Sequence, residues 1–209
     1  MAHGQTLRER RKQETREQIK QAARALMIEV GYDKVTMRAL AEAAGVGLGT
    51  IGLHFKDKKT LLLSAFHDEI GQESLRALEA MPQEGTIKEK FMAVLGRLYA
   101  YYGKNALFLR PVIREALFAT GEWRERFDAQ LGEMIHLISG LVDRHKALGE
   151  VRPEVPGHHV AMAGWSLYLN GLIDGLNCDV FDVQAQLAKV EPLLDVLLDG
   201  VLFKGDTHE

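Results

Sequence analysis

Cysteine is almost absent from this 209-residue sequence, which contains Cys178 alone. A single thiol excludes an intramolecular disulfide and a zinc site built from several cysteines, and it is compatible with a reducing compartment. The sequence also lacks any apolar run near the roughly 18 residues that a membrane span needs, and its N-terminus is charged rather than signal-like. These absences predict a cytoplasmic protein without membrane spans.

Sustained alternation of apolar and polar residues is absent as well, so we expect no β-strands. Apolar residues recur instead at helical spacing along the chain. The composition, with 46% hydrophobic and 26% charged residues, is ordinary for a soluble globular protein. At 209 residues the chain can form one large domain or two modest ones. The predicted fold class is all-α.

The net charge of −3 conceals an uneven distribution of charge. Residues 1–63 contain 12 Lys and Arg against 7 Asp and Glu, a balance of +5, and the remainder contains 14 against 22, a balance of −8. A basic N-terminal segment on an acidic body favours a polyanionic partner at one end only.

The basic residues are densest near the N-terminus, where they alternate with glutamates. Two capping boxes, Thr6-x-x-Glu9 and Thr15-x-x-Gln18, leave the start of the first helix open. The segment is either a solvated, frayed terminus or an arm that touches DNA phosphates or the minor groove. Its basic residues are Arg8, Arg10, Arg11, Lys12 and Arg16.

The stretch from Thr36 to Leu61 has the spacing of a helix-turn-helix. Thr36 can cap a first short helix, and Gly45 is the residue type that ends such a helix in a left-handed conformation. The apolar face of this helix consists of Met37, Leu40, Ala41 and Ala44.

A second helix is expected from about Gly47 to His54, with Ile51 and Phe55 facing inward. Asp57 then caps a third helix, which starts at Lys58 and runs to about Leu78. The second helix is the candidate for recognition of a DNA groove.

This region, TMRALAEAAGVGLGTIGLHFKDKKTLL, resembles the DNA-binding region of the TetR family of bacterial transcriptional repressors, including its HF pair and the lysine that follows. The resemblance implies a three-helix DNA-binding domain over residues 1–57. It also implies a larger helical ligand-binding and dimerisation domain over residues 58–209. The expected protein is a homodimeric regulator, a repressor that a small-molecule ligand releases from a palindromic operator.

The resemblance further implies DNA contacts at seven positions that match the family's motif. Their chemistry agrees in part, since hydroxyl, ammonium and guanidinium groups suit phosphates and base edges. The seven residues are Thr36, Arg38, Leu48, Gly49, Thr50, His54 and Lys58.

The recognition helix departs from the family at Gly47 and Gly52, where serine and tyrosine are common. Together with Gly49 these glycines form G-x-G-x-x-G, the fingerprint of a nicotinamide-dependent enzyme, but a helical pattern precedes it where that fingerprint needs a strand. We therefore expect neither an enzyme nor a cofactor. An all-α protein-interaction adaptor remains the other alternative. No metal site is expected, because the adjacent His158 and His159 point apart on a helix.

Five further helices are expected beyond a break at Pro82 to Gly85. Turn residues and capping signals bound them at Thr86–Gly103, Asn105–Thr120, Glu122 to the linker 149–157, about Pro156–Asn177 and Val183–Phe203.

The last two of these helices are the predicted dimer interface. Gly164, Gly171 and Gly175 share one face, where missing side chains let another helix approach closely. The final helix adds a broad apolar stripe, and the two together offer more apolar surface than one monomer needs. We expect a four-helix bundle between two copies, as the resemblance implies, with intramolecular core as the alternative.

Aromatic residues beyond residue 63 predict a ligand cavity, although many of them could be plain core. Arg110 and Arg114 share a helical face and suit an anionic head on an apolar body, while a salt bridge from Arg114 to Asp174 would explain them equally well. The candidate ligand-binding residues are Tyr99, Tyr102, Phe108, Arg110, Arg114, Phe118, Trp123, His136, Trp165, Tyr168, Asn170 and Asp174.

Overall fold

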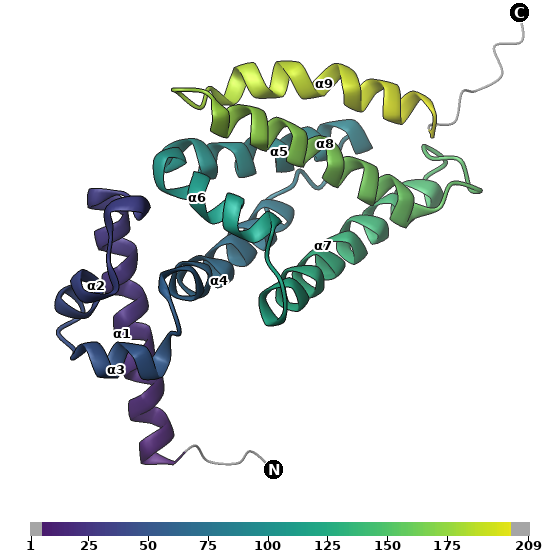
Figure 1. Cartoon of the computed structure of the whole chain (residues 1–209). Coiled ribbons are helices and arrows are strands. Elements are labelled where there is room, and N and C mark those ends of the chain that lie inside the picture. Colours follow the sequence, from purple (N-terminus) through teal and green to yellow (C-terminus); the bar gives the residue numbers. More distant parts are fainter. Residues whose placement is uncertain (1–5, 202–209) are drawn as a thin grey trace, which may run out of the picture. The chain divides into compact units, whose positions relative to one another are not determined.

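The computed structural model describes residues 6–201, which form nine α-helices and one 3-10 turn without a strand (Figure 1). The all-α prediction is confirmed. The described residues divide into two compact units. One contains the residues up to Ile70 together with Leu107–Trp123, and the other contains Gly71–Ala106 together with the residues from Arg124 onward.

The first unit contains the predicted three-helix DNA-binding domain, which with the start of α4 is called the head below, and it also contains α6. Its elements are α1 (Leu7–Val30), the 3-10 turn η1 (Tyr32–Lys34), α2 (Met37–Ala43), α3 (Leu48–His54), the first part of α4 (Lys58–Glu79) and α6 (Ala106–Leu117). The core of the head is formed by apolar residues of α1 to α4, which are Ile19, Ala23, Met27, Leu40, Ile51, Leu61 and Phe66.

The first of the two possible capping boxes starts α1. The hydroxyl oxygen of Thr6 accepts a hydrogen bond from the amide of Glu9 at 3.2 Å, and the carboxylate of Glu9 accepts one from the amide of Thr6 at 2.8 Å. Thr15 lies inside the helix, where its hydroxyl donates to the carbonyl oxygen of Arg11 at 2.9 Å. The basic segment is therefore the first turns of a long helix, and Arg8 to Lys12 lie exposed along it.

The second unit is a helical bundle around α5 (Ile87–Lys104), α8 (Gly157–Asn177) and α9 (Val183–Asp199). Helices α8 and α9 lie side by side, and both pack against α5 (Figure 1). Most of α7 (Glu122–Ala147) belongs to the same unit. One of its apolar clusters joins α5, the end of α7, α8 and α9 through Ile87, Phe91, Val142, Val151, Val155, Val160, Leu194, Leu198 and Val201.

The expected helices all occur, with ends that shift by a few residues. Helix α6 ends at Leu117 and α9 ends at Asp199, each earlier than predicted. Pro111 and Pro192 lie inside these helices without ending them. Of the predicted extension of the last helix to Phe203, Gly200 and Val201 form a turn, and residues 202–203 fall outside the described residues.

The glycine face of α8 packs against residues of its own unit. A Cβ atom at Gly164 would lie 2.7 Å from the ring of Phe91, and a Cβ atom at Gly171 would collide with the hydroxyl of Tyr99. Gly175 admits the ring of Phe181 in the same way. Phe91 and Tyr99 lie on α5, so the glycine face receives a helix of its own unit, as the alternative of intramolecular core predicts, and not a helix of a second copy. The spacing of the three glycines predicts a close approach by another segment, but it does not identify that segment.

None of the described helices combines the length and apolar character that crossing a membrane requires.

Candidate nucleic-acid interface

The turn of the helix-turn-helix is set by Thr36 and Gly45. The hydroxyl oxygen of Thr36 accepts a hydrogen bond from the amide of Ala39 at 3.2 Å and so caps α2. Gly45 has a φ angle of +64°, in the left-handed region that glycine enters without steric penalty. The amide of Val46 then donates to the carbonyl oxygen of Ala41 at 2.9 Å. Both predicted roles are confirmed.

Helix α3 has an inner and an outer face. Ile51 is fully buried and Phe55, just after the helix, is almost so. These two residues hold the helix against the head. The exposed residues of the helix are Leu48, Gly49, Gly52 and Leu53, and two of these, Gly49 and Leu53, lie four residues apart on the side opposite Ile51.

The polar residues of the interface are divided between exposed and half-buried positions. Thr36 and Arg38, at the start of α2, are exposed. Thr50 and His54 are half-buried on α3, between its inner and outer faces. The surface that α3 presents most openly is therefore apolar and poor in side chains.

The imidazole of His54 is turned partly into the head. Its Nδ1 atom is buried and has no hydrogen-bond partner among the described residues. Burial lowers the pKa of His54, and the positive charges of Arg16 and Lys12 lower it further. At neutral pH this residue is an uncharged imidazole, which suits a hydrogen bond better than a charge contact.

Arg16 holds the end of α3 in place. One of its guanidinium nitrogens donates to the carbonyl oxygen of His54 at 2.8 Å, and another donates to the hydroxyl of Ser64 on α4 at 3.1 Å. The guanidinium carbon lies 4.3 Å from the centre of the Phe55 ring. From sequence, Arg16 was grouped with the other basic residues of the N-terminal segment. Its position three residues before the buried Ile19 was the signal that it faces the head.

Lys58 contacts the head itself. Its ammonium group donates to the carbonyl oxygen of Tyr32 at 2.8 Å and lies 4.3 Å from the centre of that residue's ring. The side chain is half-buried. A contact between Lys58 and a phosphate remains a prediction, and the structure adds a second role in joining α4 to η1.

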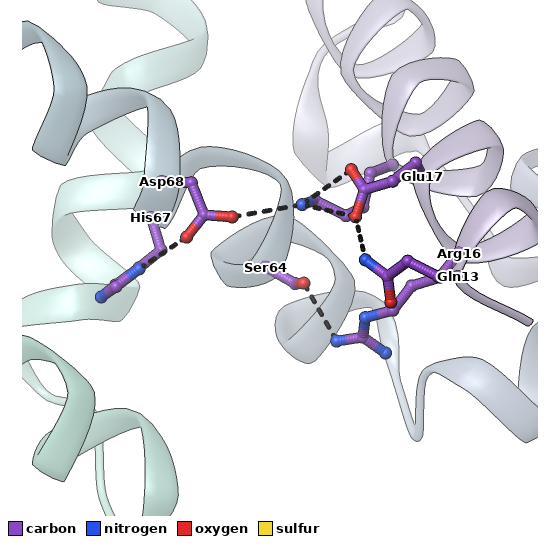
Figure 2. A network of polar contacts seen from close by, with 7 residues as sticks. Gln13, Arg16, Glu17, Ser64, His67 and Asp68 are labelled. Carbon is purple, nitrogen blue, oxygen red and sulfur yellow. Dashed lines mark hydrogen bonds and ion pairs between the residues drawn. The ribbon is translucent and has the colours of Figure 1, made fainter. Parts of the chain in front are cut away.

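Three cationic residues of α1, Arg16, Lys20 and Arg24, contact polar residues of α4. Arg16 contacts Ser64 of α4 (Figure 2). Lys20 lies between Glu17 and Asp68, at 3.1 Å and 3.4 Å from their carboxylates. Arg24 forms two hydrogen bonds of 2.9 Å with Glu69. Partial burial alone would raise the pKa of Asp68, but the contacts with His67 and Lys20 outweigh it, and this pKa is lowered. A displacement of this part of α4 would therefore act directly on α1.

The candidate ligand-binding residues of the second unit differ in how far they are buried. Tyr99, Tyr102 and Tyr168 are buried. The hydroxyl of Tyr99 donates to the carbonyl oxygen of Tyr168 at 3.0 Å, and burial raises the pKa of Tyr102 to about 12. Trp165 is half-buried beside Tyr168, with their ring centres 5.0 Å apart. The remaining three, His136, Asn170 and Asp174, are exposed.

The other five candidates belong to the first unit. Phe108 is buried against Phe66, with ring centres 4.9 Å apart, and Trp123 lies half-buried beside His67. The remaining three, Arg110, Arg114 and Phe118, are exposed. All five polar candidates of the two units, Arg110, Arg114, His136, Asn170 and Asp174, are thus exposed.

The structure bears on the considered salt bridge between Arg114 and Asp174 and on the G-x-G-x-x-G fingerprint. Arg114 lies 3.7 Å from Asp33 and 3.5 Å from Glu115, whereas Asp174 pairs with Lys189 at 2.6 Å. Each residue of the considered bridge therefore has an ion-pair partner within its own unit. The glycines of the G-x-G-x-x-G sequence belong to the turn before α3 and to α3 itself, and a helix, α2, precedes them where the fingerprint needs a strand.

Comparison with known proteins agrees with this geometry. Residues 19–65 match the family model of bacterial regulatory proteins, tetR family. The chain is 27% identical to the fatty acid metabolism regulator protein of Bacillus subtilis over 190 residues, which cover 88% of this chain and 94% of that protein. It is 28% identical to the HTH-type transcriptional repressor KstR of Mycolicibacterium smegmatis over 162 residues, which cover 77% and 76% of the two chains.

A solved structure shares the fold. The transcriptional regulator FadR from Bacillus subtilis, in complex with stearoyl-CoA, has a TM-score of 0.66 at 23% identity, over 88% of this chain and 98% of that one. The family match covers the helix-turn-helix built around Gly45, and the similarity to known regulators extends over most of the chain. Residues 19–65 are thus the DNA-binding region of a bacterial regulatory protein of the tetR type, and the chain, which is similar to such regulators over most of its length, is a DNA-binding transcriptional regulator.

Proposed function

We propose that this regulator is a homodimeric repressor that binds a near-palindromic operator and is released from it by a small-molecule effector. The observation that supports this most is the exposed outer face of α3 on a basic head. Residues 1–63 carry a balance of +5, from 12 basic and 7 acidic residues. The proposed DNA contacts are Thr36, Arg38, Leu48, Gly49, Thr50, His54 and Lys58.

An apolar surface on α8 and α9 supports the homodimer. Met162 and Ile173 lie eleven residues apart on α8, which is three helical turns, and both are exposed away from the glycine face. On α9, Leu193 and Val196 are exposed, and Val196 is 74% exposed. A twofold axis through this surface would give two heads, which must reach successive major grooves about 34–36 Å apart.

The dimer can be tested by placing a charge on this surface. Val196→Asp is expected to convert a dimer into a monomer in sedimentation equilibrium, because an unpaired carboxylate at an interface core is unfavourable. Leu148→Asp is the matched control, since Leu148 is 76% exposed outside both helices. A wild-type monomer, or a Val196→Asp dimer as stable as wild type, would contradict the proposal.

For the effector we propose an acyl thioester of coenzyme A, which has an apolar chain and an anionic head. The names of the relatives support this class, since one regulates fatty acid metabolism and the solved FadR contains stearoyl-CoA. The proposed mechanism is that the effector changes the spacing of the two heads through α4. A coupling of about 1–3 kcal/mol between the two sites is enough for regulation.

The experiment combines DNA binding with effector addition. The protein is expected to shift a duplex that flanks its own gene in the presence of excess random DNA. Stearoyl-CoA should raise the melting temperature of the protein and release that duplex, because a ligand that prefers one state stabilises it. Coenzyme A alone and stearate alone are the controls. Specific DNA binding that no acyl-CoA affects would refute the effector class, and absence of any specific shift would refute the repressor.

A further inference from the structure

The most exposed side chain on α3 is a leucine. Leu53 is 83% exposed and lies with Gly49 on the outer face, opposite the buried Ile51. Leu48, in the first turn of the helix, is 56% exposed. No polar side chain stands on this face, since Thr50 and His54 are half-buried at its edges. The face that is turned away from the head therefore has no hydrogen-bonding side chain of its own.

The fold does not account for Leu53. At this exposure the side chain contributes little to the core, and a polar residue would be the ordinary choice on a solvated helix face. The glycines beside it are not required for packing either, because a Cβ atom at Gly49 or Gly52 would meet nothing within 4 Å. Since packing does not require these residues, we explain them by the molecule that this face contacts.

The groups around the face indicate a nucleic acid rather than an apolar protein surface. Arg38 on α2 and Lys56 just after α3 are exposed, as are the basic residues near the start of α1. Exposed cations on the elements before and after α3 can bind phosphates while α3 itself meets base edges. The major groove presents one apolar group, the C5 methyl of thymine.

We propose that Leu53 is a specificity-determining residue, which contacts thymine methyl groups in the major groove while Gly49 and Gly52 let the helix approach closely. A leucine cannot donate or accept a hydrogen bond, so its contact distinguishes thymine from the other bases only through the methyl group. The inference rests on the proposed DNA-binding function. It predicts that each half-site contains a thymine opposite α3.

The test removes the methyl group without changing base pairing. The full-length protein is first used to select its preferred site from a random duplex library. Deoxyuridine then replaces each thymidine of that site in turn. Wild-type affinity is expected to fall about fourfold at one position of a half-site, and about sixteenfold when both half-sites are changed, as expected from burial of one methyl group at each.

Variants assign the effect to Leu53. Leu53→Ala should bind thymidine and deoxyuridine sites equally, whereas Leu53→Met should still discriminate, and Leu148→Ala should behave as wild type. Affinity for random DNA at low salt should be unchanged in Leu53→Ala, because no charge is lost.

Two results would overturn the proposal and are distinguishable from failure of the proposed function. A protein that selects a site but binds it equally with deoxyuridine at every position does not read methyl groups. Methyl dependence that persists in Leu53→Ala belongs to another residue. If instead no site is selected at all, the DNA-binding function itself fails, and this inference fails with it.

Discussion

Arg16 on α1 donates a hydrogen bond of 2.8 Å to the carbonyl oxygen of His54, the last residue of α3. The same guanidinium reaches Ser64 on α4, so one side chain joins three helices of the head. Arg16→Ala is expected to destabilise the protein by about 1–3 kcal/mol in urea unfolding, because two hydrogen bonds and the contact with Phe55 are lost together.

Arg11→Ala is the matched control for this prediction. Arg11 is exposed on the same helix, and its removal should leave the unfolding free energy unchanged within about 0.5 kcal/mol. Arg16→Ala should weaken DNA binding without lowering its salt dependence, since the side chain positions α3 rather than contacting phosphate. A reduced salt slope in Arg16→Ala would show instead that Arg16 is a phosphate contact.

Protonation of His54 should destabilise the head. Its pKa is lowered by burial and by the neighbouring charges of Arg16 and Lys12. As the pH falls, His54 is therefore protonated near pH 6.5 in the unfolded chain but only at a lower pH in the folded head. The stability due to this residue is complete above about pH 6.5 and is lost as the pH falls through the folded pKa.

Urea unfolding between pH 8 and pH 5 measures this effect. Relative to His54→Gln, the wild type should lose more stability as the pH falls below about 6.5. His136→Gln is the control, because His136 is exposed on α7. Parallel pH profiles for wild type and His54→Gln would show that the histidine is not perturbed.

Lys58 is expected to have two separable roles. Lys58→Ala should weaken binding to all DNA sequences alike and lower the salt slope by about 1, as for loss of one phosphate contact. It should also reduce stability, since the contact with Tyr32 is lost. Titration of random duplex DNA at several salt concentrations separates the two. If the slope equals that of wild type, Lys58 only joins α4 to η1.

Three glycines of the helix-turn-helix should respond in opposite directions to the same substitution. A Cβ atom would meet nothing within 4 Å at Gly45, Gly49 or Gly52, so backbone conformation alone decides the outcome. Gly49→Ala and Gly52→Ala should each stabilise the protein by up to about 1 kcal/mol, because alanine favours helix. Gly45→Ala should destabilise it by about 1–2 kcal/mol, because its φ angle is +64°.

Thermal or urea unfolding of the three variants checks this prediction. Destabilisation by Gly49→Ala would mean that α3 needs its glycines in the free protein. Rapid hydrogen exchange at amides 47–54 in wild type, slowed in the alanine variants, would show directly that the glycines loosen α3.

Local signals in the sequence were sufficient for most of the fold. Capping residues and glycines act through the backbone of their own helix, so Thr36 and Gly45 could be assigned from spacing alone. Long-range partners could not be assigned in this way. The glycines of α8 show that something approaches, but whether it is the ring of Phe91 or a second chain depends on residues far apart in sequence.

The candidate site shows the same limit. The position of Leu53 on the outside of α3 follows from helical periodicity, whereas the hydrogen bond that holds the end of α3 joins the carbonyl oxygen of His54 to Arg16, which lies 38 residues earlier. For the effector, residue type identified aromatics and polar groups, but Tyr99 is core and Asp174 is an exposed partner of Lys189. Burial, which decides between these roles, is a property of the folded chain.

The ratio of affinities for specific and random DNA tests the central claim most directly. A labelled duplex that flanks the regulator's own gene is titrated with protein at physiological salt, and an unlabelled random duplex of equal length competes. Binding of the flanking duplex is expected to be about a thousandfold tighter or more, as for a sequence-specific regulator, and Arg38→Ala should reduce this ratio. Equal affinity for the two duplexes would contradict operator recognition at this site.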